Sequence, residues 1–160
     1  MVRFKNRWIL FEIVEDPVLE HGKVTFKHTS LDVSDAILSK TIRDAIELNY
    51  GSFGRAMLQN SGVKWYNATT RTGIIRVPRD YTDMYLSTMF FMKQIGPIPC
   101  SFSILHVSGT IIHIQKEAIE RDRRFYLREK ERIQREEGKT ISVIEKIETS
   151  TKQIQAILAD

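Results

Sequence analysis

The chain has 160 residues and a formal net charge of +4 at pH 7. This length fits one domain with a sizeable core, and the basic balance favours a polyanion partner. One cysteine, Cys100, cannot form an internal disulfide, so the composition does not favour an oxidising compartment. The apolar runs are too short for a signal peptide or a membrane span, and we therefore expect a soluble, intracellular protein.

The N-terminal part predicts a strand followed by a helix. Apolar residues alternate along residues 3–14, which is typical of a strand with one face in the core. Residues 15–33 have no sustained period and are expected to form a loop. Ser34 is placed to cap a helix with an apolar face, and Gly51 is placed to end that helix.

The next stretch predicts a β-hairpin and carries one sign of charge. A strand over 53–66 leads through a polar turn to a return strand at 72–77. Between Gly51 and Arg79 the chain has five cations and no carboxylate. Solvated surfaces usually mix both signs, so we favour phosphate binding over the alternative, in which the cations only solubilise a sheet edge. The cations are Arg55, Lys64, Arg71, Arg76 and Arg79.

A second helix and a further strand complete the predicted sheet. Asp80 is placed to cap a helix over 81–95, Gly96 and Pro97 end it, and a strand follows at 102–107. The order strand, helix, strand, strand, helix, strand is the split βαβ arrangement. We therefore predict an α+β, ferredoxin-like sandwich whose four-stranded antiparallel sheet carries two helices on one face.

Two more helices are predicted at the C-terminal end. A long helix over 110–137 completes a single domain of residues 1–137, and an amphipathic helix within 138–160 is expected to dock on that domain or on a partner. Five arginines on one side of the long helix either follow a phosphate backbone or pair with Glu117, Glu120 and Glu131. These arginines are Arg121, Arg124, Arg128, Arg132 and Arg135.

Signatures of catalysis are weak. The four histidines lie in different elements without metal-ligand spacing, and no phosphate loop, dinucleotide fingerprint or nucleophile motif occurs. The Ser-Gly-Thr segment 108–110 either holds a phosphate beside Lys116 or forms an ordinary helix cap. Trp65 and Tyr66 either stack on bases or belong to the core and a sheet face. We therefore predict no catalytic residue and no metal ligand.

Four sequence blocks occur in a recognisable order. They are residues 1–12, the segment Tyr-Gly-Ser-Phe-Gly at 50–54, the hairpin with its Thr-Gly-Ile-Ile-Arg-Val-Pro-Arg-Asp strand at 72–80, and His-Val-Ser-Gly-Thr-Ile at 106–111. Together they resemble the Pop-five family of ribonuclease P and ribonuclease MRP protein subunits. The resemblance extends to about residue 125 and implies a ferredoxin-like fold of the RNA-recognition type, in a ribonucleoprotein whose RNA is the catalyst.

The resemblance also implies partners and a reaction. The catalytic RNA would process precursor tRNA at its 5′ end, or precursor rRNA in the MRP particle, with magnesium on the RNA and no cofactor on the protein. A TIM-barrel-like subunit and a second small subunit of related fold would be the protein partners, in the nucleus or nucleolus of a eukaryote and away from membranes. The isolated chain would not be a nuclease. The strand at 72–79 lacks stacking aromatics, which favours RNA contact through loops, edges and termini.

Two alternatives stay open beside this interpretation. A stand-alone ferredoxin-like hydrolase would use Asn67 with Arg71 or Arg76, but residues 15–33 supply no glycine-rich phosphate loop. A protein-interaction module would explain the apolar terminal helices but not the acid-free stretch. The predicted RNA-binding residues are Arg3, Lys5, Arg7, Arg55, Lys64, Arg71, Arg76, Arg79 and Lys116, with Arg121, Arg124 and Arg128 as further candidates.

Overall fold

The computed structural model describes residues 5–25, 31–58, 60–138 and 140–157. The elements, in chain order, are strands β1 (Asn6–Glu15), β2 (Val18–Glu20) and β3 (Lys23–Thr25), helix α1 (Asp35–Ala56), strands β4 (Gly62–Asn67) and β5 (Thr72–Pro78), a 3₁₀ turn (Arg79–Tyr81), helix α2 (Thr82–Phe91), strands β6 (Gln94–Ile95) and β7 (Ile98–Ser108), and helices α3 (Ile111–Glu137) and α4 (Ile144–Gln155).

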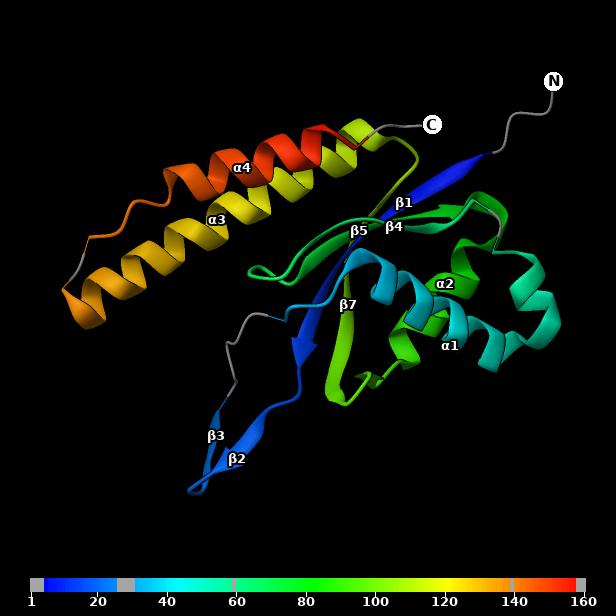
Figure 1. The fold of residues 1–160 in the computed structure, drawn as a ribbon, viewed down its shortest axis with the longest axis horizontal. Helices are drawn as coiled ribbons and strands as arrows, with labels where there is room; N and C mark the ends of the chain where they lie inside the picture. The colour runs from blue at the N-terminus through cyan, green and yellow to red at the C-terminus, as the bar shows by residue number, and fades with distance from the viewer. Residues whose placement is uncertain (1–4, 26–30, 59, 139, 158–160) are drawn as a thin grey trace.

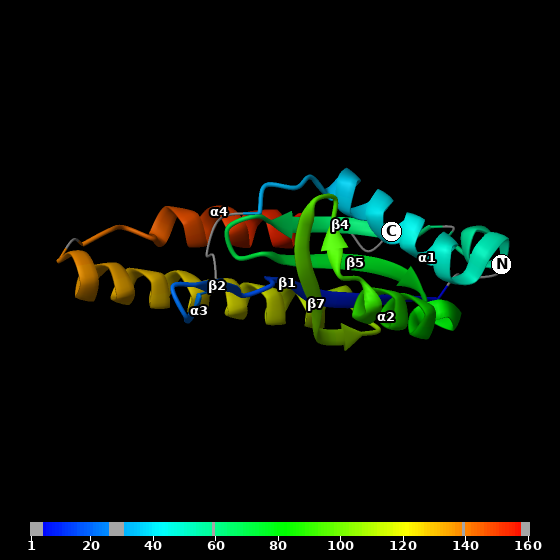
Figure 2. The ribbon, with the colours of Figure 1, turned by 90° about the horizontal axis from the view of Figure 1, so that it is seen from below.

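One antiparallel sheet lies between two pairs of helices. Its strand order is β4-β5-β1-β7-β6. Helices α1 and α2 cover one face, and α3 and α4 cover the other (Figure 1). The sheet is curled, and Figure 2 shows the bend along β7. The α+β class predicted from the sequence is confirmed.

The predicted count of four strands is wrong, because the sheet has five. The four predicted strands are present as β1, β4, β5 and β7. The additional strand, β6, pairs with the start of β7 across a tight turn. Gly96 occupies that turn with a φ of +57°, a left-handed conformation that suits glycine. The Gly-Pro signal therefore marks a hairpin turn between two paired strands, and the prediction that it ends the second helix is wrong, because α2 ends at Phe91.

Helix α1 begins as predicted and ends later. The Ser34 hydroxyl accepts a hydrogen bond from the Ile37 amide at 3.3 Å, so the predicted cap is confirmed. Gly51 has a φ of +61° and kinks the helix, which then continues to Ala56. The prediction of a strand from residue 53 is wrong for this reason: one left-handed residue interrupts the helix without ending it.

Two other segments differ from the prediction. The expected loop at 15–33 contains the two-stranded sheet β2–β3, whose turn residues His21 and Gly22 have φ values of +50° and +77°. Its strands are three residues long and largely exposed, too short to show a period. Helix α2 begins after a 3₁₀ turn that contains Asp80, so Asp80 is not its cap.

The alternation predicted for β1 separates two cores. Ile9, Phe11 and Ile13 pack with α1 and α2, where Leu38 and Tyr85 are also buried. The intervening side chains face the other way, toward α3 and α4. This second core contains Trp8, Leu10, Trp65, Ile74, Ile114, Ala118 and Ile154. Because both faces carry apolar side chains, each needs a covering layer.

The sequence of α3 predicts a heptad-spaced apolar seam through Ile112, Ile119 and Tyr126, and the buried row differs from it. The buried residues recur every four positions as Ile114, Ala118, Asp122 and Tyr126. Ile112, which belongs to the predicted heptad seam, is 60% exposed. Gly138 ends the helix in the left-handed conformation, with a φ of +66°, as the sequence indicates. The row faces both the sheet and α4.

Candidate nucleic-acid interface

Three cations lie where β1 begins and β5 ends, beside the start of α3, and a fourth lies on α3 itself. The Arg79 amide donates to the Lys5 carbonyl oxygen at 2.9 Å, which joins the two chain segments. Arg7 reaches the start of α3: a Cβ atom added to Gly109 would lie 3.2 Å from the Arg7 Nη1 atom. Lys116 is exposed in the second turn of α3. We call this surface the basic end: Lys5, Arg7, Arg79 and Lys116.

The basic end carries positive charge that stays available. In the part of the chain that the structure describes, none of its four side chains forms an ion pair. The N-cap of α3, Thr110, makes no side-chain cap, and the first turn has no acidic residue. The helix therefore adds the partial positive charge of its N-terminus to the cations. This combination suits oxyanions such as phosphates.

Other predicted cations lie away from this surface. Arg55 is on α1 and pairs with Glu47 at 2.9 Å. Arg71 is at the opposite end of the sheet, where it lies 3.6 Å from the Glu15 carboxylate, and both side chains are 13% exposed. Lys64 is exposed on the outer strand β4. The acid-free stretch of sequence therefore does not form an acid-free surface, because α1 and β1 bring carboxylates to it.

Arg76 lies in the middle of β5 and is only 8% exposed. Its neighbours Ile75 and Val77 belong to the core under α1 and α2, so Arg76 faces α3 and α4, as the alternation predicts. Its Nε is buried and makes no hydrogen bond with any described group. A covering helix layer, rather than open solvent, therefore meets this arginine.

Three of the six arginines of α3 pair with carboxylates of the same helix. Arg121 pairs with Glu117 at 3.1 Å, and Arg124 pairs with Glu120 at 2.7 Å, which supports the ion-pair alternative for these two residues. Arg132 lies between two further carboxylates of the same helix. Within the described ranges Arg128 and Arg135 have no ion pair, so the pairing of Glu131 with Arg135 that the alternative included is not formed. Another predicted residue, Arg3, lies outside the described residues.

A buried polar network joins the hairpin to both C-terminal helices. The Asp122 carboxylate is 3% exposed and accepts hydrogen bonds from the Asn67 amide at 3.1 Å and the Thr72 hydroxyl at 3.2 Å. It also accepts from the hydroxyl of Ser150 on α4. The Asn67 amide donates in addition to the Tyr126 hydroxyl at 3.2 Å. Sequence reasoning missed this network, although a carboxylate in the four-residue apolar row of α3 was a usable signal.

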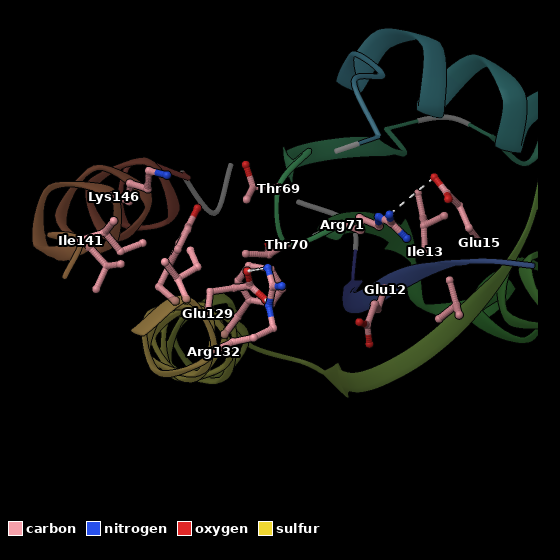
Figure 3. Close-up of a pocket in the computed structure, with 15 residues that line it drawn as sticks. Glu12, Ile13, Glu15, Thr69, Thr70, Arg71, Glu129, Arg132, Ile141 and Lys146 are labelled. Carbon is pink, nitrogen blue, oxygen red and sulfur yellow. Dashed lines mark hydrogen bonds and ion pairs between the residues drawn. The ribbon is translucent and has the colours of Figure 1, made fainter. Parts of the chain in front are cut away.

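A pocket of about 440 Å³ lies beside this network, between the hairpin tip and helices α3 and α4. Figure 3 shows that its two arginines face carboxylates: Arg71 is directed toward Glu15, and Arg132 toward Glu129. Apolar side chains such as Ile141 also line it. Since its guanidinium groups already have acidic partners, the pocket offers less free positive charge than the basic end.

A buried thiol and a half-buried phenol hold their protons tightly. Burial raises the pKa of the Cys100 thiol to about 11. Burial also raises the pKa of the Tyr66 phenol, and the nearby Arg71 charge opposes that shift only in part.

Over the described residues, no group of three or more His, Cys, Asp or Glu side chains is arranged to hold a metal ion. None of the helices, over the same residues, is long and apolar enough to cross a membrane.

Comparisons with known proteins give consistent matches. A family model described as the Rpp14/Pop5 family matches residues 7–119. The ribonuclease P/MRP protein subunit POP5 of Schizosaccharomyces pombe is 31% identical over 124 residues, which cover 77% of this chain and 89% of that protein. Its human counterpart is 33% identical over 129 residues, which cover 78% and 74%. A chain in the cryo-EM structure of yeast ribonuclease MRP gives a TM-score of 0.46 at 15% identity, covering 69% of this chain and 79% of that chain.

Proposed function

The chain belongs to the Rpp14/Pop5 family, and from this premise we propose that it is a protein subunit of ribonuclease P or ribonuclease MRP that binds and stabilises the catalytic RNA. The particle would process precursor tRNA at its 5′ end, or precursor rRNA in the MRP form. The reaction would belong to the RNA, which would also hold the magnesium, so purified RNA-free protein should not cleave precursor tRNA.

The observation that carries RNA binding is the basic end. Lys5, Arg79 and Lys116 are exposed, Arg7 is half-buried, and the start of α3 adds uncapped amides. Phosphates of a folded RNA would sit across this surface, and each contact would release counterions. Arg55 serves as the contrast, because Glu47 already neutralises its charge at 2.9 Å.

A salt titration tests this assignment. Lys5→Ala and Arg79→Ala should each reduce the slope of log affinity against log salt by about 1, measured with the catalytic RNA. Arg55→Ala removes the same charge and should leave the slope unchanged. Equal slopes for all three variants and the parent protein would show that the basic end does not contact RNA.

We also propose where a protein partner binds. Aromatic side chains lie at the C-terminal end of α1 and at both ends of α2: the ring centroids of Phe53 and Tyr81 are 6.1 Å apart, and those of Phe90 and Phe91 are 5.2 Å apart. Phe90 and Phe91 are 67% and 68% exposed, and contiguous exposed apolar side chains mark interaction sites. The aromatic surface comprises Tyr50, Phe53, Tyr81, Phe90 and Phe91. We assign it to the TIM-barrel-like subunit; a second small subunit of related fold would bind elsewhere.

Co-purification tests the aromatic surface. Replacing Phe90 and Phe91 with serine should abolish capture of the TIM-barrel-like subunit while thermal unfolding stays close to that of the parent, because both side chains are exposed. Ile112→Ser, at a 60% exposed apolar position on α3, is the matched control and should retain the partner. Retention of the partner by the double variant would contradict the assignment.

The hydrolase alternative is not favoured. The Asn67 amide, which would have to orient a substrate, donates to Asp122 and Tyr126. Arg71 pairs with Glu15, and Arg76 is buried in the face under α3 and α4. Without the short strands β2, β3 and β6, the elements from β1 to β7 follow the order β-α-β-β-α-β, and α3 and α4 come after them. This order supports our proposal of a ferredoxin-like, RNA-recognition-type fold. We also propose a nuclear or nucleolar location, because relatives of the chain occur in eukaryotes.

A further inference from the structure

Two tryptophans and an arginine lie together on the sheet face under the C-terminal helices. Trp8 is directly opposite Arg76 in the register of β1 and β5. Trp65 is opposite Ile74, which precedes Arg76 by two positions and shares its face. Opposite residues have Cβ atoms about 5 Å apart, and diagonal neighbours about 7–8 Å apart. We call this group the Trp-Arg cluster: Trp8, Trp65 and Arg76.

The cluster contains donors without acceptors. The Nε of Arg76 and the Nε1 of Trp65 are both buried, and neither makes a hydrogen bond in the described structure. No ion pair between described residues includes Arg76. A buried donor without an acceptor is destabilising, and a guanidinium without a counter-charge more so. The cluster is therefore incomplete as a core and is suited to an acceptor from outside the chain.

The helix beside the cluster is attached by few contacts. Only Ser150 and Ile154 are buried in α4, and Ile154 belongs to the same core as both tryptophans. Its polar attachments are the Ser150 bond to Asp122 and the Gln115 amide, which donates to the carbonyl oxygens of Ile154 at 2.9 Å and Ile157 at 3.1 Å. A twelve-residue helix is marginal without such packing. Helix α4 also lies beyond residues 7–119, which the family model matches.

We propose that the Trp-Arg cluster is a second RNA site, which binds single-stranded RNA when α4 moves away from the sheet. Bases would stack on the two indoles, and a phosphate would accept hydrogen bonds from Arg76. An apolar protein segment would cover the tryptophans, but it would leave Arg76 without an anion. The inference rests on the proposed function, because it adds a surface to a subunit that already binds RNA at the basic end.

The test uses the full chain and a short oligouridine as the probe. Ser150→Ala combined with Gln115→Ala removes both polar attachments of α4, and we call this the open variant. Thr149→Ala, at the adjacent exposed position, is the matched control. The chain's two tryptophans both belong to the cluster, so intrinsic fluorescence reports on it directly. The open variant should bind oligouridine at least about tenfold more tightly than the control, with quenched fluorescence. Adding Arg76→Gln should remove that gain.

Hydrogen exchange establishes that α4 has opened while the sheet stays protected. If the open variant keeps α4 protected, Ile154→Asp takes its place, because it removes the buried apolar anchor. An opened α4 without a gain in oligouridine affinity overturns the inference, and so does a gain that survives Arg76→Gln. If the gain is absent while Lys5→Ala still lowers the salt slope with the catalytic RNA, this inference alone fails. Loss of both responses means that the proposed function fails as well.

Discussion

Replacing Asp122 with alanine should destabilise the junction of the hairpin, α3 and α4. The carboxylate is 3% exposed and accepts hydrogen bonds from Asn67, Thr72 and Ser150. It has no cation among these partners, so the three neutral donors alone compensate its burial. Alanine removes the acceptor for all of them at once.

The structure allows the cost to be estimated. The Asn67 amide still donates to Tyr126 at 3.2 Å, and the Thr72 hydroxyl still bonds to Thr70 at 2.6 Å. Ser150 has no other described hydrogen bond, so one donor loses its acceptor, which costs about 1–3 kcal/mol. Two further bonds to a charged acceptor are lost, but the carboxylate no longer has to be desolvated. We expect a net loss of about 2–4 kcal/mol.

Urea unfolding measures this loss as a lower midpoint at an unchanged slope. Arg123→Ala changes the exposed neighbour of Asp122 on the same helix and should stay within about 0.5 kcal/mol of the parent. The pair Asp122→Ala and Ser150→Ala should be less than additive, because both remove the same bond. A loss below about 1 kcal/mol for Asp122→Ala would refute the reasoning, since at least one buried donor would then have found another acceptor.

Two further predictions concern the core under α1 and α2. Gly73→Ala should destabilise the protein by about 1–3 kcal/mol, because its Cβ would lie 2.5 Å from the Phe11 ring, whereas Gly62→Ala meets nothing closer than 3.6 Å and should be far milder in the same urea assay. The Cys100 thiol should react with alkylating reagents at neutral pH only on unfolding, because burial raises its pKa from 9.0 to about 11. As the pH rises, the unfolded chain loses the Cys100 proton before the folded chain does. The contribution of the buried thiol to the free energy of unfolding is therefore complete below about pH 9 and is lost as the pH rises through about 11. Cys100→Ala should remove this part of the decline in unfolding free energy at alkaline pH.

Local signals predicted the features that depend on a few neighbouring residues. The alternation of Ile9, Phe11 and Ile13 assigned one face of β1 correctly, because strand side chains alternate strictly. Ser34 and Gly138 marked helix ends because a cap hydroxyl and a left-handed glycine act within one turn. Gly51 carried the same local signal as Gly138 but lies inside a helix, since the residues after it resume helical geometry. The sequence around a glycine does not distinguish a kink from an end.

The candidate site was harder to predict because charges pair across the fold. Arg71 follows a stretch without acids, yet β1 brings Glu15 to 3.6 Å from it. Only the pairing of β1 with β5 creates that contact, and sequence distance conceals it. By contrast, Glu117 and Glu120 lie four residues before their arginines, and those ion pairs were predictable from helix geometry.

The two covered faces of the sheet explain why binding surfaces lie at its ends and on its helices. Leu10 and Ile74 are fully buried on the face opposite Ile9 and Ile75, so the strands commit both faces to packing. While α4 stays on the sheet, RNA has access to chain termini and helix starts, where the basic end lies, and a protein partner has access to the aromatic surface on α1 and α2. These surfaces share no residue. Lys5→Ala should therefore weaken RNA binding and leave capture of the protein partner intact. Replacing Phe90 and Phe91 with serine should weaken partner capture and leave RNA binding intact. If every variant lowered both kinds of binding together, the substitutions would have damaged the fold rather than either surface.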